Sequence, residues 1–303
     1  FLRLAFLRHP DDEEVIRRLA GLYEELKRYS ELALLYESLG EMTPEPEKRV
    51  KYYFDACGIL RSQVKSPDGA ADVLKKILDV DPTNQVAVDE LEEIARETGN
   101  DEELAVWVGH KADLTTDQTQ RRDLRMELAG ILARVPDRAM DAAAVLDQIV
   151  DENPDDEDAW SMYENILKGL SSFDSLADMY MKIGRTATAS TLRLASLKKA
   201  ASVFEARLQD RYSAVTALEM ILELEPADNF AFERLSVLLT ESSDFDNLLK
   251  LYTTREEALE DEAGRAAMNL RIAGVLHRRM GRTVEALERY RKVIDFDPRD
   301  EEA

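Results

Sequence analysis

Apolar residues recur along the whole chain at the three- and four-residue spacing of amphipathic helices, and the pattern returns every 72 residues. Three rows of residues show this period: Ala70, Ala142, Ala214 and Ala286; Leu74, Leu146, Leu218 and Tyr290; Ile77, Ile149, Ile221 and Val293. Within one repeat these positions lie four and three residues apart, so they share one face of a helix. We therefore predict an all-helical protein built from a long internal repeat.

A proline ends each of these predicted helices. The spacing of 72 residues is kept without insertion or deletion by Pro10, Pro82, Pro154, Pro226 and Pro298. Two residues after each proline comes Asp12, Asn84, Asp156, Asp228 or Asp300. Proline is unfavourable inside a helix, and Asp or Asn caps the start of the next one by accepting a backbone N–H bond. The prolines are thus predicted joints between helices, and the other four (Pro44, Pro46, Pro67, Pro136) fall between predicted helices.

Three more amphipathic stretches complete each repeat. The first is clear at 159–170 and 230–241, and the second is anchored at Leu32, Leu104, Leu176 and Leu248. The third begins near Arg49, Arg121, Arg193 and Arg265 and carries Cys57, Ala129, Ala201 and Ala273 in step. We expect a trailing helix, four repeats of four helices and the start of a fifth, or about 16–17 helices in a single array over residues 1–303.

The pattern resembles the tetratricopeptide repeat (TPR), a helical hairpin of about 34 residues. The stretch VEALERYRKVIDFDPRD places Ala286, Tyr290, Val293 and Pro298 at the Ala, Phe, Ala and Pro positions of the family, and Trp160 stands where its Trp falls. The doubled unit is similar to that of long bacterial TPR arrays. Its 72 residues exceed two family repeats, so about four extra residues are expected before or inside the third helix. The resemblance implies a right-handed α-solenoid of tandem TPR-like hairpins.

Charge and composition narrow the function. The chain has 62 acidic and 40 basic residues, a net charge of −22, which argues against nucleic-acid and anionic-membrane partners. No stretch approaches the roughly 20 apolar residues of a membrane span, and no signal peptide is visible, so we expect a cytoplasmic location. The chain opens in mid-pattern at Phe1 and is interpreted as a piece of a longer protein.

The two ends of the array are expected to be uncovered. Phe1, Leu4 and Phe6 at one end, and Val293, Ile294 and Phe296 at the other, would lack neighbouring hairpins. Repeat arrays need polar caps for solubility. We therefore predict end-to-end self-association or frayed terminal helices.

Candidate chemistry is scarce. His9 and His110 have no partners at metal spacing, and Cys57 takes a position that holds alanine in the other repeats, which predicts a packed thiol. The acidic stretch 151–158 lacks the glycine and glutamate of a calcium loop. We predict no catalytic, cofactor or metal site. His277 is the exception among the histidines, because its helix is expected to face a groove where it can touch a ligand.

The resemblance implies that the first and third helices of each repeat line a concave groove. Carried over by position, the partner-binding residues are Arg17, Glu24, Phe54, Arg61, Asp89, Glu93, Met126, Asn165, Lys168, Lys198, Glu233, Leu270 and His277. Glycine recurs on the third helices at Gly58, Gly130 and Gly274. Either close helix packing or room for a partner explains such a row.

The predicted function is a non-catalytic scaffold for peptide or helical segments of protein partners. Apolar Phe54, Met126 and Leu270 alternate with acidic residues, which suits a segment carrying basic and apolar side chains, although the carboxylates can also be a merely solvated face. Lys198 with Ser202 is the nearest approach to the family's carboxylate clamp and lacks the partner residues, so a chaperone-tail receptor is not expected. The alternative is a regulatory or substrate-recruiting arm of a larger enzyme or machine.

Overall fold

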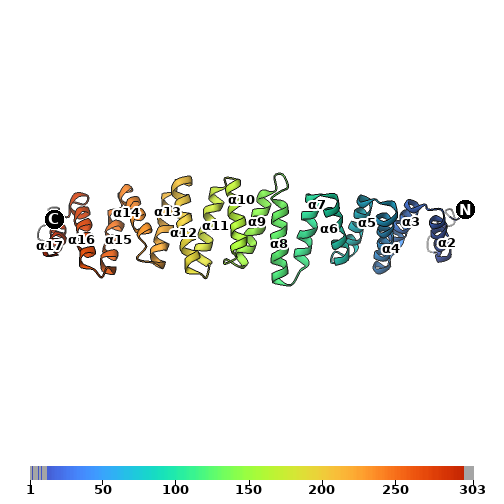
Figure 1. Cartoon of the computed structure of the whole chain (residues 1–303), viewed down its shortest axis with the longest axis horizontal. Coiled ribbons are helices and arrows are strands. Elements are labelled where there is room, and N and C mark those ends of the chain that lie inside the picture. Colours follow the sequence, from blue (N-terminus) through green and yellow to red (C-terminus); the bar gives the residue numbers. More distant parts are fainter. Residues whose placement is uncertain (1, 3–5, 7, 9–11, 297–303) are drawn as a thin grey trace. The chain divides into compact units, whose positions relative to one another are not determined.

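The computed structural model describes residues 2, 6, 8 and 12–296. They form two compact units, Phe1–Ile149 and Val150–Ala303. Both units consist of helices and their linkers (Figure 1). Phe1, Leu4, His9, Pro10, Pro298 and Asp300 lie outside the described residues. The boundary falls within one helix, and the expectation of a single array over 1–303 stays a prediction.

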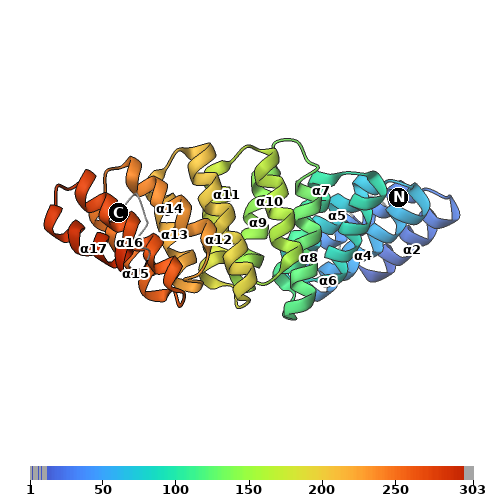
Figure 2. The same cartoon turned by 60° about the vertical axis from the view of Figure 1, so that its left-hand side comes forward.

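The described residues contain sixteen α-helices and no strand, which confirms the all-α fold. The N-terminal unit contains α2 (Glu13–Glu25), α3 (Tyr29–Met42), α4 (Pro46–Ile59), α5 (Pro67–Val80), α6 (Gln85–Thr98), α7 (Asp101–Leu114) and α8 (Gln118–Leu132), and α9 (Ala139–Glu152) crosses the boundary. The C-terminal unit contains α10 (Glu157–Gly169), α11 (Phe173–Thr186), α12 (Ser190–Val203), α13 (Arg211–Leu224), α14 (Asn229–Glu241), α15 (Phe245–Ala258), α16 (Glu262–Arg278) and α17 (Thr283–Phe296). The helices group into four repeats of four (α2–α5, α6–α9, α10–α13, α14–α17), each of two hairpins. Within the C-terminal unit they follow one another in chain order (Figure 2).

The joints lie where the prolines predicted them. Asp12, Asn84, Asp156 and Asp228 cap α2, α6, α10 and α14. Asp228, for example, accepts a bond from the backbone N–H of Ala231 at 2.8 Å. Two of the other prolines differ from expectation: Pro46 and Pro67 are the first residues of α4 and α5 rather than linker residues. Proline suits that position because its fixed φ is helical and the missing N–H has no partner there.

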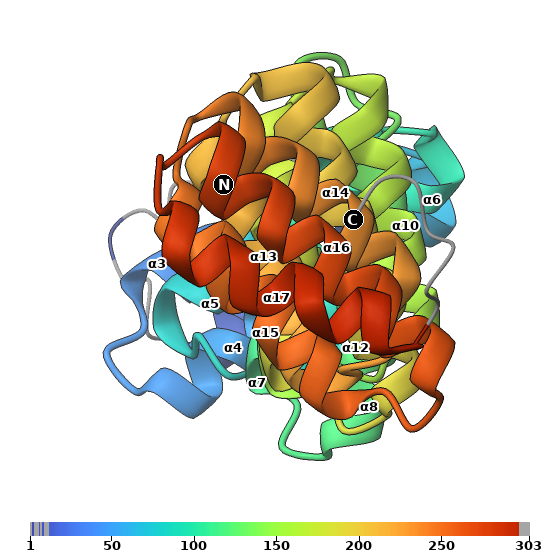
Figure 3. The same cartoon turned by 90° about the vertical axis from the view of Figure 1, so that its left-hand side faces the viewer.

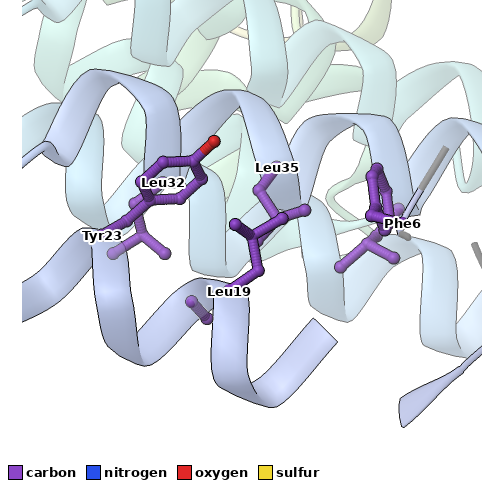
Figure 4. Packing of buried hydrophobic residues seen from close by; sticks show 7 residues of the cluster. Phe6, Leu19, Tyr23, Leu32 and Leu35 are labelled. Carbon is purple, nitrogen blue, oxygen red and sulfur yellow. The ribbon is translucent and has the colours of Figure 1, made fainter. Parts of the chain in front are cut away.

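The rows that repeat every 72 residues form the core. Ala70, Leu74 and Ile77 of α5 are fully buried, as are Ala214, Leu218 and Ile221 of α13. Figure 4 shows the packing at the start of the N-terminal unit, where Phe6, Leu19 and Leu35 belong to one buried cluster. The expectation that Phe6 is uncovered is therefore wrong, since α2 and α3 bury it.

At the other end of the chain, α16 and α17 lie side by side (Figure 3). Val293 is buried, whereas Ile294 and Phe296 are about half exposed. End-to-end association stays a prediction. No helix among the described residues has the length and apolar content to cross a bilayer.

The third helix is lengthened at its end in the first and third repeats. In two repeats α4 and α12 continue into single π-turns, η1 (Leu60–Val64) and η2 (Phe204–Leu208). The turns stand at equivalent positions 144 residues apart, and each ends at a left-handed residue, Lys65 or Gln209. A π-turn accommodates an insertion without breaking the helix. In these two repeats the extra length predicted before or inside the third helix is thus inside it, whereas in the second repeat residues 133–138 form a linker between α8 and α9.

In three repeats, the arginine at the start of the third helix hydrogen-bonds to the end of the second helix. Arg49, Arg193 and Arg265 each donate a guanidinium bond to a carbonyl at the end of the preceding helix, of Thr43, Gly184 and Leu259 respectively. These carbonyls have no partner within their own helix, so a cation there satisfies the bond and complements the helix dipole. At these three positions the arginine is therefore structural.

Two layers of helices run through each unit. Layer A contains the first and third helices of each repeat (α2, α4, α6, α8; α10, α12, α14, α16). Ion pairs join its successive members: Arg61–Glu93, Arg96–Glu127, Lys199–Glu164 and Arg271–Glu233. Layer B contains the second and fourth helices and is joined by Lys76–Glu37, Lys75–Glu103 and Arg289–Glu256. Within each unit, the first and third helices of the repeats thus share one surface.

Candidate functional site

The predicted partner-binding residues all lie on layer A, counting η1 with α4. Eight are exposed, and Phe54, Arg61, Met126, Lys198 and Leu270 are half-buried. Because none is buried, this surface remains a candidate binding face in each unit.

Three of the four acidic members of this set already have cations beside them. Glu93 pairs with Arg61 at 2.8 Å and Asp89 with Lys111 at 2.7 Å. Glu233 pairs with Arg271 at 3.0 Å. These pairs lower the net attraction that the carboxylates would exert on a basic segment.

Other members of the set act within their own hairpin. Arg17 pairs with Glu14 of the same helix, and Lys168 with Glu164. The His277 ring lies edge-on to Tyr290 of α17, with centroids 6.5 Å apart. His277 thus reaches a layer B helix as well as the surface.

The recurrent glycines are not packed closely. A Cβ added to Gly58 or Gly274 would meet no atom within 4 Å. Close helix packing is therefore the wrong explanation for glycine at these two positions. The other explanation, room for a partner, stays a prediction.

We expect Gly274→Ala to raise the free energy of unfolding by about 0.5–1 kcal/mol, because alanine restricts the unfolded chain and fits the open space of α16. Urea denaturation followed by circular dichroism measures the change. A loss of stability would show that neighbouring atoms approach Gly274 more closely than the structure has them.

Cys57 is a packed thiol, as predicted. It is 1% exposed, and burial, then the Glu90 carboxylate, raises the pKa of its thiol above 9.0 to about 12. The thiolate is the nucleophile of cysteine chemistry, so this side chain is poorly suited to it.

We expect iodoacetamide to alkylate Cys57 at least about a hundredfold more slowly in the folded protein than in urea at the same pH. In the folded protein the rate should keep rising with pH beyond 9, because the pKa lies near 12. Mass spectrometry of timed samples measures both rates. A rate that levels off near pH 9 would contradict the raised pKa.

The C-terminal unit contains a pocket of about 620 Å³, here named the basic pocket. It opens between layer A helices and has α11 of layer B beside it. Its lining residues are Lys168, Phe173, Leu176, Tyr180, Lys198, Lys199, Ser202, Val203, Arg207 and Phe230. The structure thus brings together Lys168 and Lys198, which the resemblance selected separately, and adds residues that were not predicted.

Two buried carboxylates, those of Glu164 and Asp228, form ion pairs with the lysines of the basic pocket. Glu164, 9% exposed, pairs with Lys168 and, at 2.8 Å, with Lys199. Burial alone raises the pKa of Glu164, but hydrogen bonds from these lysines and Tyr180 outweigh it and hold the pKa below its ordinary value. Asp228, 8% exposed, pairs with Lys198 while it caps α14.

Aromatic rings flank the cations of the basic pocket. The Lys199 ammonium lies 4.9 Å from the ring centre of Trp160 and 5.2 Å from that of Tyr180. Lys198 lies over Phe230, and Arg207 lies 5.1 Å from the ring centre of Phe173. Cation–π contacts of this kind orient the charged groups without neutralising them.

A second pocket, of about 420 Å³, lies in the N-terminal unit. It is bordered by Asp89, Lys111, Asp117 and neighbouring polar residues, and Lys111 is held by Asp89 and by Glu92 at 2.9 Å. Among the described residues no group of three or more His, Cys, Asp or Glu side chains could hold a metal ion.

The repeating hairpins and their two layers define a TPR-like helical repeat protein. No protein-family model matches the chain, and no curated protein matches its sequence. Among solved structures it is similar to YrrB, described as a TPR protein with an unusual peptide-binding site, at 16% identity and a TM-score of 0.29, over 60% of this chain and 90% of that one. It is also similar to yeast Tom70 at 13% identity and a TM-score of 0.26, over 96% of this chain and 77% of that one.

Proposed function

We propose that the chain is a non-catalytic scaffold for protein interactions and that layer A presents a groove for peptide or helical segments of its partners. The observation that supports this most is the basic pocket, which combines side chains from four helices and η2 around an apolar floor. Binding sites of this kind are concave, largely apolar and equipped with a few placed polar groups. Within the C-terminal unit, the predicted partner-binding residues Asn165, Glu233, Leu270 and His277 lie on the same layer A.

Selection of phage-displayed random peptides on the whole chain tests this proposal. Ser202→Trp fills the basic pocket from an exposed position of α12, and Thr254→Trp, exposed on α15 of layer B, is its matched control. We expect peptides that bind the wild type and Thr254→Trp but lose binding to Ser202→Trp. Peptides that bind all three proteins equally would place the site elsewhere, and a selection without enrichment would overturn the scaffold function.

A further inference from the structure

We propose that the basic pocket binds an acidic peptide segment, with an apolar side chain seated on the pocket floor and carboxylates on its cationic rim. This inference rests on the proposed scaffold function and names the chemistry of the partner. It is carried by the charges at the pocket and by a comparison of the repeats with one another.

The basic pocket is a positive site on an acidic protein. Its lining contains Lys168, Lys198, Lys199 and Arg207 and no carboxylate. The two buried carboxylates behind it leave an excess of two positive charges. Among the described residues Arg207 has no carboxylate partner and is held only over the ring of Phe173. A ligand carboxylate would therefore find a cation whose charge is still uncompensated.

The fold does not require these cations. At equivalent positions 144 residues earlier, the four cations are replaced by Glu24, Phe54, Asp55 and Gln63. The neighbouring apolar positions do persist: Tyr29 for Phe173, Leu32 for Leu176, Tyr36 for Tyr180 and Ile59 for Val203. The apolar residues are thus common to the first and third repeats, whereas the four positive charges are specific to the third. The third repeat alone has cations at all four positions.

The floor of the pocket selects an apolar group. Phe173, Val203 and Phe230 border it and are partly exposed, and Leu176 is buried beneath. Covering this surface with an aromatic or branched aliphatic side chain removes apolar area from water. Acidic neighbours in the same segment would then meet Lys168, Lys198 and Arg207. Nucleic acid is disfavoured, because its continuous phosphate backbone would extend beyond the pocket onto a surface of net charge −22.

The peptides enriched on the wild-type chain test the proposal through their composition. We expect Asp or Glu on either side of one aromatic or aliphatic residue. A synthetic peptide of the enriched sequence should bind more weakly at high salt, because screening weakens exposed charge pairs. Its Asp→Asn and Glu→Gln form should bind at least about tenfold more weakly.

The matched protein variant is the double substitution Lys168→Gln with Arg207→Gln. Gln also stands 144 residues before Arg207, and the Lys168 substitution leaves Glu164 paired with Lys199. We expect at least about tenfold weaker peptide binding, with an unchanged thermal unfolding curve. Lys250→Glu, which makes the same change of two charge units at an exposed position of layer B, should bind like the wild type.

Three results would overturn the proposal. Enriched peptides without acidic residues, or with basic ones, would leave the scaffold function intact and refute the acidic partner. Binding that the double variant does not weaken would do the same. A labelled oligouridine that binds as tightly as the peptide, with the same dependence on Lys168 and Arg207, would assign the pocket to nucleic acid. No enrichment at all would overturn the scaffold function itself.

Discussion

Replacing Leu218 with alanine is expected to lower the free energy of unfolding by about 2–5 kcal/mol. Leu218 lies on α13 with no exposed surface, in a row that repeats every 72 residues. The substitution removes buried methyl groups and leaves a cavity that neighbouring helices fill only in part. Urea denaturation followed by circular dichroism measures the loss.

Leu287→Ala is the matched control, because Leu287 is 52% exposed on α17 of the same unit. It should change the free energy of unfolding by about 0.5 kcal/mol or less, as surface substitutions do. Equal losses for the two variants would mean that the row containing Leu218 is not the core of the C-terminal unit.

Gly184→Ala is expected to lower the free energy of unfolding by about 1–3 kcal/mol. A Cβ at Gly184 would lie 2.6 Å from Cγ and from Cδ2 of Leu197, a distance at which side-chain atoms overlap. Leu197 is fully buried and cannot move aside without shifting α12. The same substitution at Gly274, where space is open, should stabilise the protein instead.

A double-mutant cycle isolates this contact. In the Leu197→Ala background the overlap is gone, so Gly184→Ala should be neutral or stabilising by up to about 1 kcal/mol through helix propensity. An equal cost in both backgrounds would place the strain elsewhere than at the Gly184–Leu197 contact.

The crossing of the second and third helices explains why Gly184 was overlooked by sequence reasoning. The residue pairs at this crossing are Gly40–Tyr53, Ala112–Arg125, Gly184–Leu197 and Glu256–Asn269. At the fourth pair, the Asn269 amide donates a hydrogen bond to the Glu256 carboxylate at 2.7 Å. This pair is therefore matched by polarity rather than by side-chain size. Gly40–Tyr53, Gly184–Leu197 and Glu256–Asn269 are each matched across a contact, whereas no single position of the repeat shows a consistent residue type. Such matching becomes visible only when the partners are known.

The lining of the basic pocket was also predicted in part. The resemblance selected Lys168 and Lys198, but Lys199, Arg207 and Phe230 were missed. Part of their signal was present in the sequence as a departure from the repeat, since the positions of Lys168, Lys198, Lys199 and Arg207 are all basic only in the third repeat. The preference for basic segments, drawn from Asp89, Glu93 and Glu233, stays a prediction and is weakened by their ion pairs.

The sequence by itself determined the helices, their joints and the buried rows. These features depend on local chemistry, namely apolar spacing, proline and capping side chains. Each of these signals recurs several times along the chain with the 72-residue period. Tertiary structure alone decided which charges neutralise one another, which glycines are crowded and where the surface is hollowed. Those properties depend on distances between side chains of different helices, such as Glu164 with Lys199, which lie 35 residues apart in the chain and 2.8 Å apart in space.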